Sequence, residues 1–418
     1  MKKIARKLLD DLKAHLDSKE ISLIVGPRQS GKTTLMLELK IFLEEKGAKT
    51  VLLNLDFESD KVFFESQANM LKKLDLEFGR EKAYVFIDEI QRKENAGVFL
   101  KGLYDMNLPY KFIVSGSGSL ELKEKIHESL AGRKRLFELG TVSFEEFVDF
   151  KTDYKYSNKL EDFFRLETNV ASGLLNEYLN FGGYPRVILT PEVSEKIKII
   201  NEIFRSYIEK DIAYLLNIDR VDAFGMLIRV LASQPGQIIT YSKLANDIGV
   251  AVATVKNYIW YAEKTFSIKM IKPFFKNKRK EITKSPAVYF YDFGLMNFSL
   301  GLFGNLNKSE QLGFVFQNFV ANQLGEKIQN TAKNLGYWRT LGGAEVDFVL
   351  SDGQIVLPIE VKYSKLKNTK ITVSLHNFIR EYKPAEAWVV NLSLNAEIKV
   401  GTTVVRFIPF YLLSSFLG

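Results

Sequence analysis

One short glycine-rich stretch limits the folds open to this chain. Residues 26–34 read GPRQSGKTT and match the pattern G-x-x-x-x-G-K-[ST], between the apolar run ISLIVG and the helical pattern TLMLELKIFLEEKG. Glycines let the backbone wrap around a phosphate, so that successive N–H groups and the N-terminus of the next helix point at the anion. The stretch therefore predicts a phosphate-binding loop between a buried strand and a helix.

The residues of this loop have predicted roles in binding ATP and Mg²⁺. Lys32 is expected to reach the β- and γ-phosphates, and the hydroxyl group of Thr33 is expected to bind Mg²⁺. The predicted nucleotide contacts are Gly26, Pro27, Arg28, Gln29, Ser30, Gly31, Lys32, Thr33 and Thr34.

An acidic motif further along the chain completes the predicted site. The run YVFIDE is four apolar residues followed by Asp88 and Glu89. Two acids at the end of a strand place Asp88 near the Mg²⁺ ion and Glu89 where it can orient and polarise an attacking water molecule. The sequence therefore predicts ATP hydrolysis.

Two further residues are candidates for catalysis. The run YKFIVSGSGS brings Ser115 or Ser117 beside the phosphate-binding strand, where a hydroxyl could touch the γ-phosphate or the water; the alternative is a plain turn with a serine cap. Arg133 follows a helical pattern, and an arginine from a neighbouring subunit can stabilise the departing phosphate. The alternative is that Arg133 only complements the helix dipole.

The composition excludes several kinds of site. The 418 residues include no cysteine and only three histidines, which excludes disulfides, zinc–thiolate sites and cysteine nucleophiles. Any metal should be a hard cation held by oxygens, with Mg²⁺ the first candidate. The N-terminus is charged at every turn and the apolar C-terminal stretch is shorter than the roughly 20 residues of a membrane span. We therefore expect a cytoplasmic protein with no membrane segment.

The motifs together resemble a known family. GPRQSGKTT, FIDEIQ, IVSGSGSLEL, ESLAGR, ELGTVSFEEF and YLNFGGYP are similar to the AAA+ ATPases of archaea and bacteria that carry a C-terminal domain of unknown function. The resemblance covers essentially the whole chain. It implies a parallel sheet with a strand inserted between the phosphate-binding strand and the Asp-Glu strand, a helical lid, and assembly into a ring or another homo-oligomer.

The pattern of the whole chain predicts an α/β multidomain protein. Apolar runs alternating with helical patterns predict a P-loop AAA+ parallel-sheet core over residues 1–140. Helical periodicity predicts the lid over residues 141–225. We expect a winged helix-turn-helix over residues 226–295 and a C-terminal α/β domain, similar to restriction endonucleases, over residues 296–418.

The predicted winged helix is a candidate for binding DNA. Its helix-turn-helix pattern leaves Thr254, Lys256, Asn257 and Tyr258 available to a groove or a phosphate backbone. A basic hairpin follows, and its predicted contacts are Lys276, Lys278, Arg279 and Lys280. The net charge of +8 permits contact with nucleic acid. The alternative is a packing module with a solvated, lysine-rich edge.

A hairpin near the C-terminus is a candidate nuclease site. In AEVDFVLSDGQIVLPIEVK, an Asp-Gly turn that pairs Ser351 with Gln354 would gather four polar side chains on one face. These are Glu345, Asp347, Glu360 and Lys362. The spacing D-x₁₂-E-x-K resembles the PD-(D/E)xK nuclease core, in which two carboxylates hold Mg²⁺ and a lysine lowers the pKa of the attacking water.

The hairpin departs from that nuclease pattern at two positions. Gln317 stands where a preceding helix often supplies another acid, and Pro358 interrupts a strand. Three interpretations stay open: an active nuclease, an inactive nuclease fold that only binds nucleic acid, and an ordinary polar sheet face with a Glu–Lys pair.

Three functions are compatible with these patterns. The first is an oligomeric ATP-hydrolysing protein that acts on DNA. The second is a nucleotide-dependent switch that binds a protein partner and has an inactive nuclease-like domain. The third is a transcriptional regulator that uses the helix-turn-helix alone.

Overall fold

The computed structural model describes residues 3–117, 129–207, 220–275, 285–306, 311–329, 331–353 and 355–416. Its contacts divide the chain into two units, each assembled from segments that are not adjacent in sequence. Unit 1 comprises Met1–Phe150, Gly183–Val221 and Trp260–Ser267, and unit 2 comprises Lys151–Gly182, Asp222–Ile259 and Ile268–Gly418. The predicted domains are consecutive instead, and the predicted lid contributes to both units. The four domain boundaries stay predictions.

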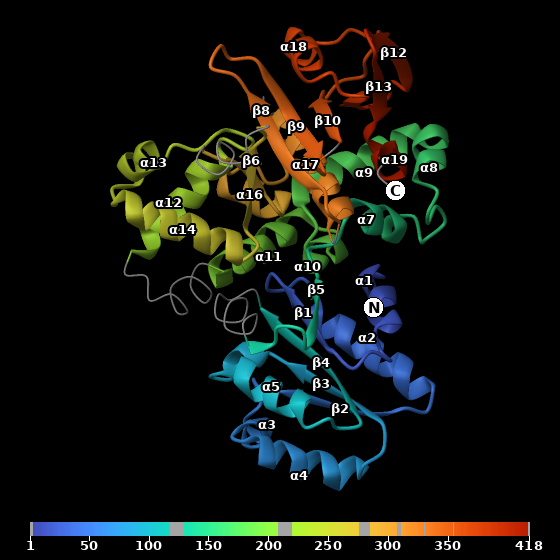
Figure 1. The fold of residues 1–418 in the computed structure, drawn as a ribbon, viewed down its shortest axis with the longest axis vertical. Coiled ribbons are helices and arrows are strands. Elements are labelled where there is room, and N and C mark those ends of the chain that lie inside the picture. The colour runs from blue at the N-terminus through green and yellow to red at the C-terminus, as the bar shows by residue number, and fades with distance from the viewer. Residues whose placement is uncertain are drawn as a thin grey trace. The chain divides into compact units, whose positions relative to one another are not determined.

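A five-stranded parallel sheet is the centre of unit 1 (Figure 1). Its strands are β1 (Ile21–Gly26), β2 (Lys49–Asn54), β3 (Ala83–Asp88), β4 (Tyr110–Ser117) and β5 (Lys134–Glu138), in the order β2-β3-β4-β1-β5. Strands β1, β3 and β4 are buried along their whole length, which agrees with their continuous apolar sequences. Strand β4 lies between β1 and β3, so the inserted strand that the resemblance implied is confirmed.

Helices cover both faces of this sheet. Helices α1 (Leu8–Ala14) and α2 (Lys32–Glu45) pack on one face, and α5 (Ala96–Asp105) lies on the other (Figure 1). The buried cluster under α1 and α2 consists of Leu12, Leu16, Ile24, Leu35, Met36, Leu39, Leu43, Tyr84, Phe86, Ile113, Phe137 and Leu139. Further helices of unit 1 are α3 (Glu58–Lys61), η1 (Val62–Phe64), α4 (Gln67–Phe78), η2 (Ile90–Arg92), α7 (Phe144–Lys151), α10 (Pro185–Leu189) and α11 (Val193–Ser206).

A mixed eight-stranded sheet is the centre of unit 2. Its strands are β6 (Ile268–Pro273), β7 (Ala287–Phe290), β8 (Asn334–Arg339), β9 (Glu345–Ser351), β10 (Val356–Val361), β11 (Glu386–Asn391), β12 (Ala396–Val400) and β13 (Thr403–Pro409). Strands β8, β9 and β10 form an antiparallel meander, after which β10, β11 and β13 run parallel. Strand β6 pairs with both β7 and β8. One sheet therefore contains strands from both sides of the predicted domain boundary between residues 295 and 296.

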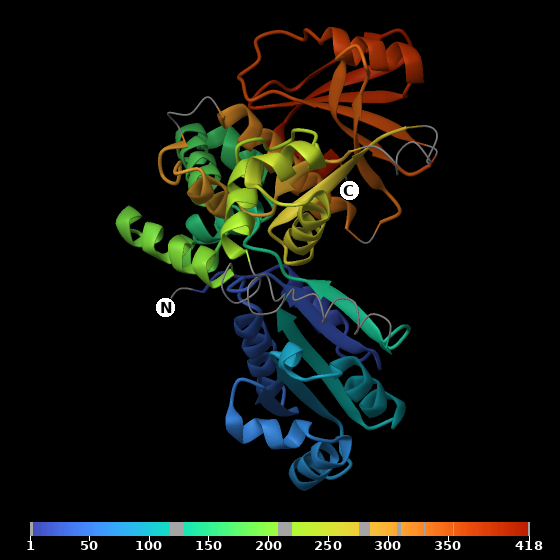
Figure 2. The same cartoon turned by 90° about the vertical axis from the view of Figure 1, so that its left-hand side faces the viewer.

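Unit 2 also contains helices around this sheet (Figure 2). They are α8 (Leu160–Leu166), α9 (Thr168–Phe181), α12 (Val221–Ala232), α13 (Tyr241–Ile248), α14 (Val252–Lys264), α16 (Phe293–Ser299), α17 (Leu312–Ile328), α18 (Val373–Tyr382), η5 (Phe410–Leu412) and α19 (Leu413–Phe416), although Val221 of α12 and residues 260–264 of α14 belong to unit 1. Gly249, with a φ of 66°, makes the left-handed turn between α13 and α14. Within the residues described above, no helix has the length and apolar character needed to cross a membrane.

Candidate functional site

The glycine-rich loop has the shape that its sequence predicts. Strand β1 ends at Gly26 and helix α2 begins at Lys32. Gly31 has a φ of 97°, which only glycine adopts at little cost. A Cβ atom at Gly26 would lie 2.0 Å from the carbonyl oxygen of Leu139, so a larger residue does not fit there. The two glycines therefore set the path of the loop.

The interior of the loop presents polar groups that suit a phosphate. Lys32 is buried, and its Nζ donates to the carbonyl oxygens of Gly26, at 3.1 Å, and Pro27, at 2.8 Å. The hydroxyl group of Ser30 is fully buried and has no hydrogen-bond partner within the described part of the chain. Phosphate oxygens are acceptors that can satisfy both side chains, so the residues present fit a bound nucleotide.

The carboxylate of Asp88 connects three of the predicted site residues. Asp88 ends strand β3 and is 1% exposed. The Thr33 hydroxyl donates to its Oδ2 at 2.7 Å, and the Ser115 hydroxyl donates to its Oδ1. The parallel order of β1, β4 and β3 explains this meeting, because the ends of adjacent parallel strands share one edge of the sheet.

The same residues fit Mg²⁺. The described ranges contain no group of three or more histidine or acidic side chains that could hold a metal by themselves. Mg²⁺ at nucleotide sites keeps several waters and is bound by few protein ligands plus phosphates. The Thr33 hydroxyl, steadied by Asp88, is therefore a suitable partial ligand set.

The second acid is held by a residue that sequence reasoning missed. Glu89 has a left-handed backbone, with a φ of 57°, and its carboxylate accepts a hydrogen bond from the Gln91 side chain. The side-chain oxygen of Gln91, Oε1, in turn accepts from the backbone N–H of Ser117 at 3.1 Å. The Ser117 hydroxyl is buried without a partner among the described residues. Gln91 therefore links the predicted catalytic acid to the end of β4, and its only sequence signal was its place in FIDEIQ.

Arg133 lies far from the loop of its own chain. It directly precedes β5, whose first residue pairs with Ile21 at the beginning of β1. The loop follows the other end of β1, roughly 17 Å away at about 3.3 Å per residue. The Arg133 guanidinium donates to Asp105, with N–O distances of 2.7 and 3.3 Å. Any contact of Arg133 with a nucleotide would therefore require a second copy of the chain.

This position gives a testable expectation for nucleotide binding. Arg133→Ala should leave the affinity for ADP unchanged within about two-fold, because the lost Asp105 contact is at the surface and the loop is untouched. A fluorescent-ADP titration measures this, and a ten-fold weakening would contradict the placement. Mixing Arg133→Ala with Lys32→Ala protein then tests action between subunits, since turnover should return only in mixed assemblies.

Two arginines that sequence reasoning did not select contact the loop. Arg186, at the beginning of α10, donates to the side chain of Gln29 at 3.2 Å. Arg6 donates to the carbonyl oxygen of Ser30 at 2.8 Å. Neither belongs to a motif near the loop in sequence, and only the adjacent GGYP stretch drew attention to the region of Arg186.

The candidate nuclease hairpin differs in register from the prediction. Ser351 pairs with Val356 instead of Gln354, so the register is shifted by two residues relative to the prediction. The backbone N–H of Asp352 donates to the carbonyl oxygen of Ile355 at 3.3 Å, and the Asp352 side chain accepts from the backbone N–H of Ile355 at 2.8 Å, so the turn begins after Asp352 and not after Ser351. The predicted Asp-Gly turn is wrong because Asp352 is paired with Ile355 and does not lie within the turn.

A bulge also interrupts the alternation of side chains along β9. Val346 pairs with Trp338 and Val349 pairs with Gly336, so two residues of β9 oppose Tyr337. Val346 and Val349 consequently join the same buried cluster. The single polar face predicted from strict alternation is therefore not reproduced.

The polar residues of the hairpin have separate partners. Asp347 accepts from the Gln317 side chain of α17 at 3.0 Å and from the backbone N–H of Val361 at 2.7 Å. Glu360 is buried and accepts from the Thr372 hydroxyl at 2.7 Å. Lys362 lies 2.6 Å from the other oxygen of the same carboxylate. The structure thus contains the Glu–Lys pair of one interpretation, next to a separately bonded Asp347.

Burial raises the pKa of Asp347 from 3.8 to about 7. The hydrogen bond from Val361 lowers the pKa and the nearby Glu360 raises it further. Glu345, by contrast, is exposed and lies 3.7 Å from Arg339. Asp347 is consequently a buried acid of this group whose pKa is clearly raised from its ordinary value.

The helix-turn-helix residues are only partly as predicted. Lys256 and Asn257 are exposed on α14, and the Lys256 ammonium lies 5.6 Å from the centre of the Tyr241 ring. Tyr258 is buried and packs on Phe224, so it is not available to a groove. The basic residues Lys276, Lys278, Arg279 and Lys280 lie outside the described residues.

Comparison with known families agrees with the loop geometry. Residues 18–148 match the family described as AAA domain. This match is confined to the N-terminal part of the chain. Residues 172–306 match a domain of unknown function, DUF8612, and residues 312–413 match another, DUF4143. The matched segment includes β1, the loop, Asp88 and Glu89, so the predicted nucleotide-binding site lies entirely within it.

Relatives of the whole chain occur in archaea and bacteria. An uncharacterised protein of Methanocaldococcus jannaschii is 27% identical over 408 residues, which are 96% of this chain and 86% of that protein. An uncharacterised protein of Haemophilus influenzae is 26% identical and covers 88% of each chain. One from Mycobacterium tuberculosis is 26% identical over 80% of this chain and 68% of its own length.

Solved structures show a weak likeness. A replication initiator DnaA bound to AMPPCP and single-stranded DNA matches 63% of this chain and 90% of its own, at a TM-score of 0.32 and 15% identity. A DNA replication initiation factor matches at a TM-score of 0.25 and 15% identity, over 62% and 86% of the two chains. Similarity at this level supports no transfer of function.

Proposed function

We propose that this protein binds ATP with Mg²⁺ in its AAA domain, hydrolyses it, and uses the cycle to act on DNA through unit 2. The observation that carries the first part is the position of Asp88, which joins Thr33 and Ser115 beside the end of the phosphate-binding loop. The residues that sequence reasoning assigned to three separate motifs thereby form one site.

Four side chains of the proposed nucleotide site have specific roles in this proposal. Lys32 would exchange the loop carbonyls for phosphate oxygens and so neutralise their charge. Thr33 would hold Mg²⁺, which supplies electrostatic stabilisation of the transferred phosphate. Ser115 would keep Asp88 oriented, and Glu89 would orient the attacking water once its carboxylate leaves Gln91.

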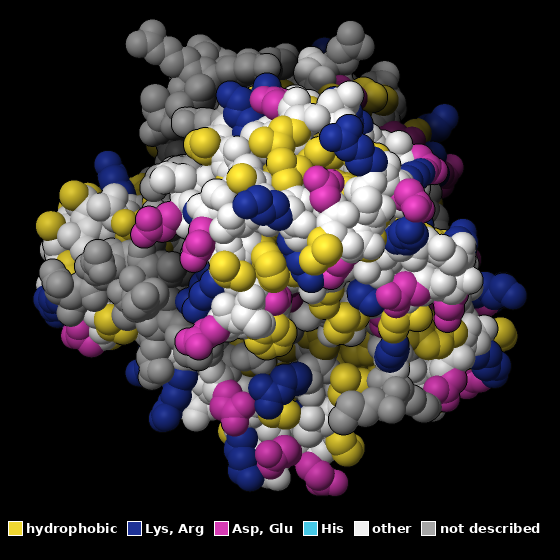
Figure 3. Space-filling view, turned by 90° about the horizontal axis from the view of Figure 1, so that it is seen from below, with side chains coloured by type: hydrophobic (Ala, Val, Ile, Leu, Met, Phe, Trp, Pro, Cys, Tyr) yellow, Lys and Arg dark blue, Asp and Glu magenta, His cyan; other side chains and the backbone are white. Residues whose placement is uncertain are grey.

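The arrangement of α12 to β7 supports contact with DNA. Helix α12, the α13–α14 pair and the β6–β7 hairpin follow each other in the order of a winged helix, and Ile238 bridges to Ala287 beside the hairpin. Such folds place their second helix in a groove and their hairpin on the phosphate backbone. By contrast, Figure 3, which views the molecule from below Figure 1 on the side of α3 and α4, shows basic and acidic side chains interspersed, which suits solvent better than a polyanion.

The order α17-β8-β9-β10-α18-β11 supports a nuclease-like fold in unit 2. The β-bulge beside Asp347 is also of a kind that often occurs next to active sites. Gln317 and Lys362 already occupy the carboxylates of Asp347 and Glu360. We therefore propose that this domain grips nucleic acid, with cleavage as the alternative that a direct assay decides.

The assay uses end-labelled single-stranded, duplex and forked DNA with Mg²⁺ or Mn²⁺, with and without ATP. The proposal predicts retarded mobility of DNA and an altered rate of ATP turnover at low salt, without cleavage. Cleavage by the wild type that Glu360→Ala abolishes and Glu397→Ala retains would make the domain a nuclease. If DNA changes neither mobility nor turnover, the protein is a nucleotide-dependent switch for another partner.

The raised pKa of Asp347 predicts a pH-dependent stability. Between about pH 4 and pH 7 the folded state keeps a proton that the unfolded state has released, so the free energy of unfolding falls as pH rises through this window. Asp347→Asn stays neutral and should lose this part of the dependence. The measurement is the thermal midpoint at about pH 5 and about pH 8.

The matched control for that prediction is Glu345→Gln, which removes an exposed acid from the same strand. The difference between the two midpoints should shrink in Asp347→Asn and stay as in the wild type in Glu345→Gln. Equal pH dependence in all three proteins would show that Asp347 titrates in its ordinary range.

A further inference from the structure

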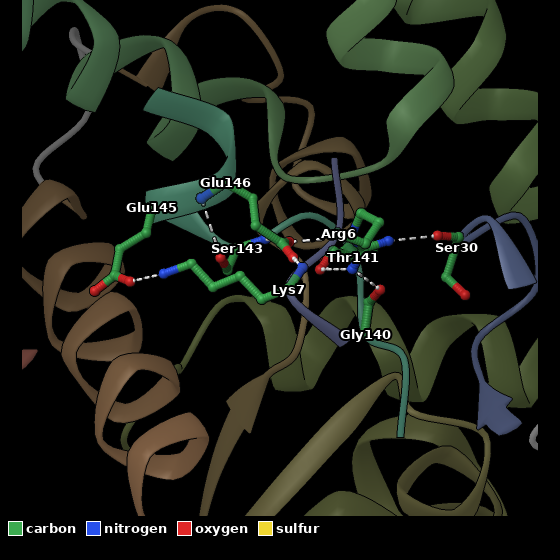
Figure 4. Close-up of polar contacts among 8 residues, drawn as sticks. All are labelled: Arg6, Lys7, Ser30, Gly140, Thr141, Ser143, Glu145 and Glu146. Atoms are coloured by element: carbon green, nitrogen blue, oxygen red, sulfur yellow. Dashed lines mark hydrogen bonds and ion pairs between the residues drawn. The ribbon is translucent and has the colours of Figure 1, made fainter. Parts of the chain in front are cut away.

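Arg6 connects the N-terminal segment to the phosphate-binding loop (Figure 4). Its side chain is only 9% exposed although it precedes the first helix. The guanidinium donates to the carbonyl oxygen of Ser30 at 2.8 Å, and to those of Gly140 at 2.9 Å and Thr141 at 3.2 Å. A fourth bond runs from its Nε to Glu146 at 3.0 Å. Four contacts on a buried arginine make this a built position and not a chance surface contact.

The bond to Ser30 has a direct consequence for the loop. In a planar trans peptide the C=O and the following N–H point in opposite directions. By holding the Ser30 carbonyl oxygen, Arg6 keeps the N–H of Gly31 turned away from itself. The Nη1 atom also lies 4.0 Å from the place where a Cβ of Gly31 would be. Arg6 thus braces the loop from outside at the residue with the left-handed backbone.

The Glu146 carboxylate joins this arginine to helix α7. Its Oε2 accepts from Arg6 and from the backbone N–H of Ser143 at 2.9 Å, and its Oε1 accepts from the backbone N–H of Lys7 at 2.8 Å. The Ser143 hydroxyl accepts from the N–H of Glu146 in return, which is a capping box at the beginning of α7. The buried ion pair between Arg6 and Glu146 therefore connects the loop to the first turn of α7.

We propose that Arg6 is a positioning residue of the nucleotide site that also transmits the state of the loop to α7. It fixes the Ser30–Gly31 peptide for phosphate binding, and a change in that peptide alters the Arg6–Glu146 pair. The planar guanidinium is needed because a single ammonium cannot reach acceptors on the loop, the end of β5 and α7 together. This proposal rests on the proposed binding of ATP.

The test compares nucleotide binding by wild type, Arg6→Ala, Arg6→Lys and Lys7→Ala. Lys7→Ala is the matched control because the Lys7 side chain pairs with Glu145, and among the described residues it has no hydrogen bond or ion pair with the loop. Arg6→Ala is expected to weaken the binding of ADP and ATP by about ten-fold to a hundred-fold at a temperature where the protein is folded. Arg6→Lys should recover little of this, Lys7→Ala should bind as the wild type, and KM should rise more than kcat falls.

A second measurement needs no variant. In the wild-type protein, added ADP should slow hydrogen exchange in residues 3–7 and in residues 140–147, although neither segment contains a predicted nucleotide contact. Unchanged exchange there, or Arg6→Ala with wild-type affinity, overturns the proposal. A wild type that binds neither ADP nor ATP instead refutes the proposed function, so the two failures are distinguishable.

Discussion

Replacement of Lys32 by alanine is expected to lower ATP turnover on the order of 10²–10³-fold, the range seen when one preorganised donor is removed from a charged transition state. The physical reason is the position of the amine, which is buried inside the loop with two backbone carbonyls as partners. These carbonyls are neutral acceptors, so the charged phosphate oxygens of a nucleotide could replace them as partners of the Lys32 ammonium group. Steady-state phosphate release with saturating Mg²⁺ measures the effect.

Lys40→Ala is the control for Lys32→Ala. Lys40 lies on the same helix and forms an exposed pair with Glu44 at 2.5 Å. It should leave turnover within about two-fold of the wild type, because exposed pairs contribute little. Equal losses in both variants would mean that the helix, and not the amine of Lys32, limits activity.

Glu89→Gln is expected to separate binding from hydrolysis. Loss of a general base or water-orienting acid lowers rates by about 10²–10⁴-fold. The amide keeps nearly the same volume, and the bonds from Thr33 and Ser115 to Asp88 do not involve it. The variant should therefore retain nucleotide affinity while turnover collapses, and it should accumulate unhydrolysed ATP in a filter-binding assay.

The control for Glu89→Gln is Glu94→Gln, an exposed acid five residues further along. It should hydrolyse ATP at the wild-type rate. Turnover that survives in Glu89→Gln would assign the base to another group, and affinity that is lost with turnover would place Glu89 in binding instead of catalysis.

Local motifs predicted the glycine-rich loop between β1 and α2 and the position of Asp88 beside it. The loop depends on glycines whose conformations and close contacts are encoded at single positions, such as Gly26 and Gly31. Asp88 and Glu89 end an apolar strand, and the order of a parallel sheet brings that end beside the loop. No long-range information beyond strand order was needed.

The residues that support the loop from distant parts of the chain could not be predicted from the sequence. Arg6 and Glu146 are 140 residues apart, and nothing local marks either as a partner of the loop. Arg133 lies at the opposite end of β1 from the loop of its own chain, because strand direction and not sequence distance decides its place, so its predicted role stays a prediction about a second copy of the chain.

The hairpin in unit 2 shows how weakly a turn motif fixes register. Asp352-Gly353 favours a loop made of these two residues, but Asp352 pairs with Ile355 instead. The bulge opposite Tyr337 then redirects Asp347 toward α17. Both effects depend on neighbouring elements, so the separate environments of Asp347 and Glu360 appear only in the folded chain.

The most direct test of the account is equilibrium titration of the wild-type protein with ATP and Mg²⁺, compared with Lys32→Ala. The account predicts saturable binding to one site per chain, strengthened by Mg²⁺ and lost in the variant. Absence of saturable binding by the wild type, or equal binding by both proteins, would contradict the assignment of the loop as a nucleotide site.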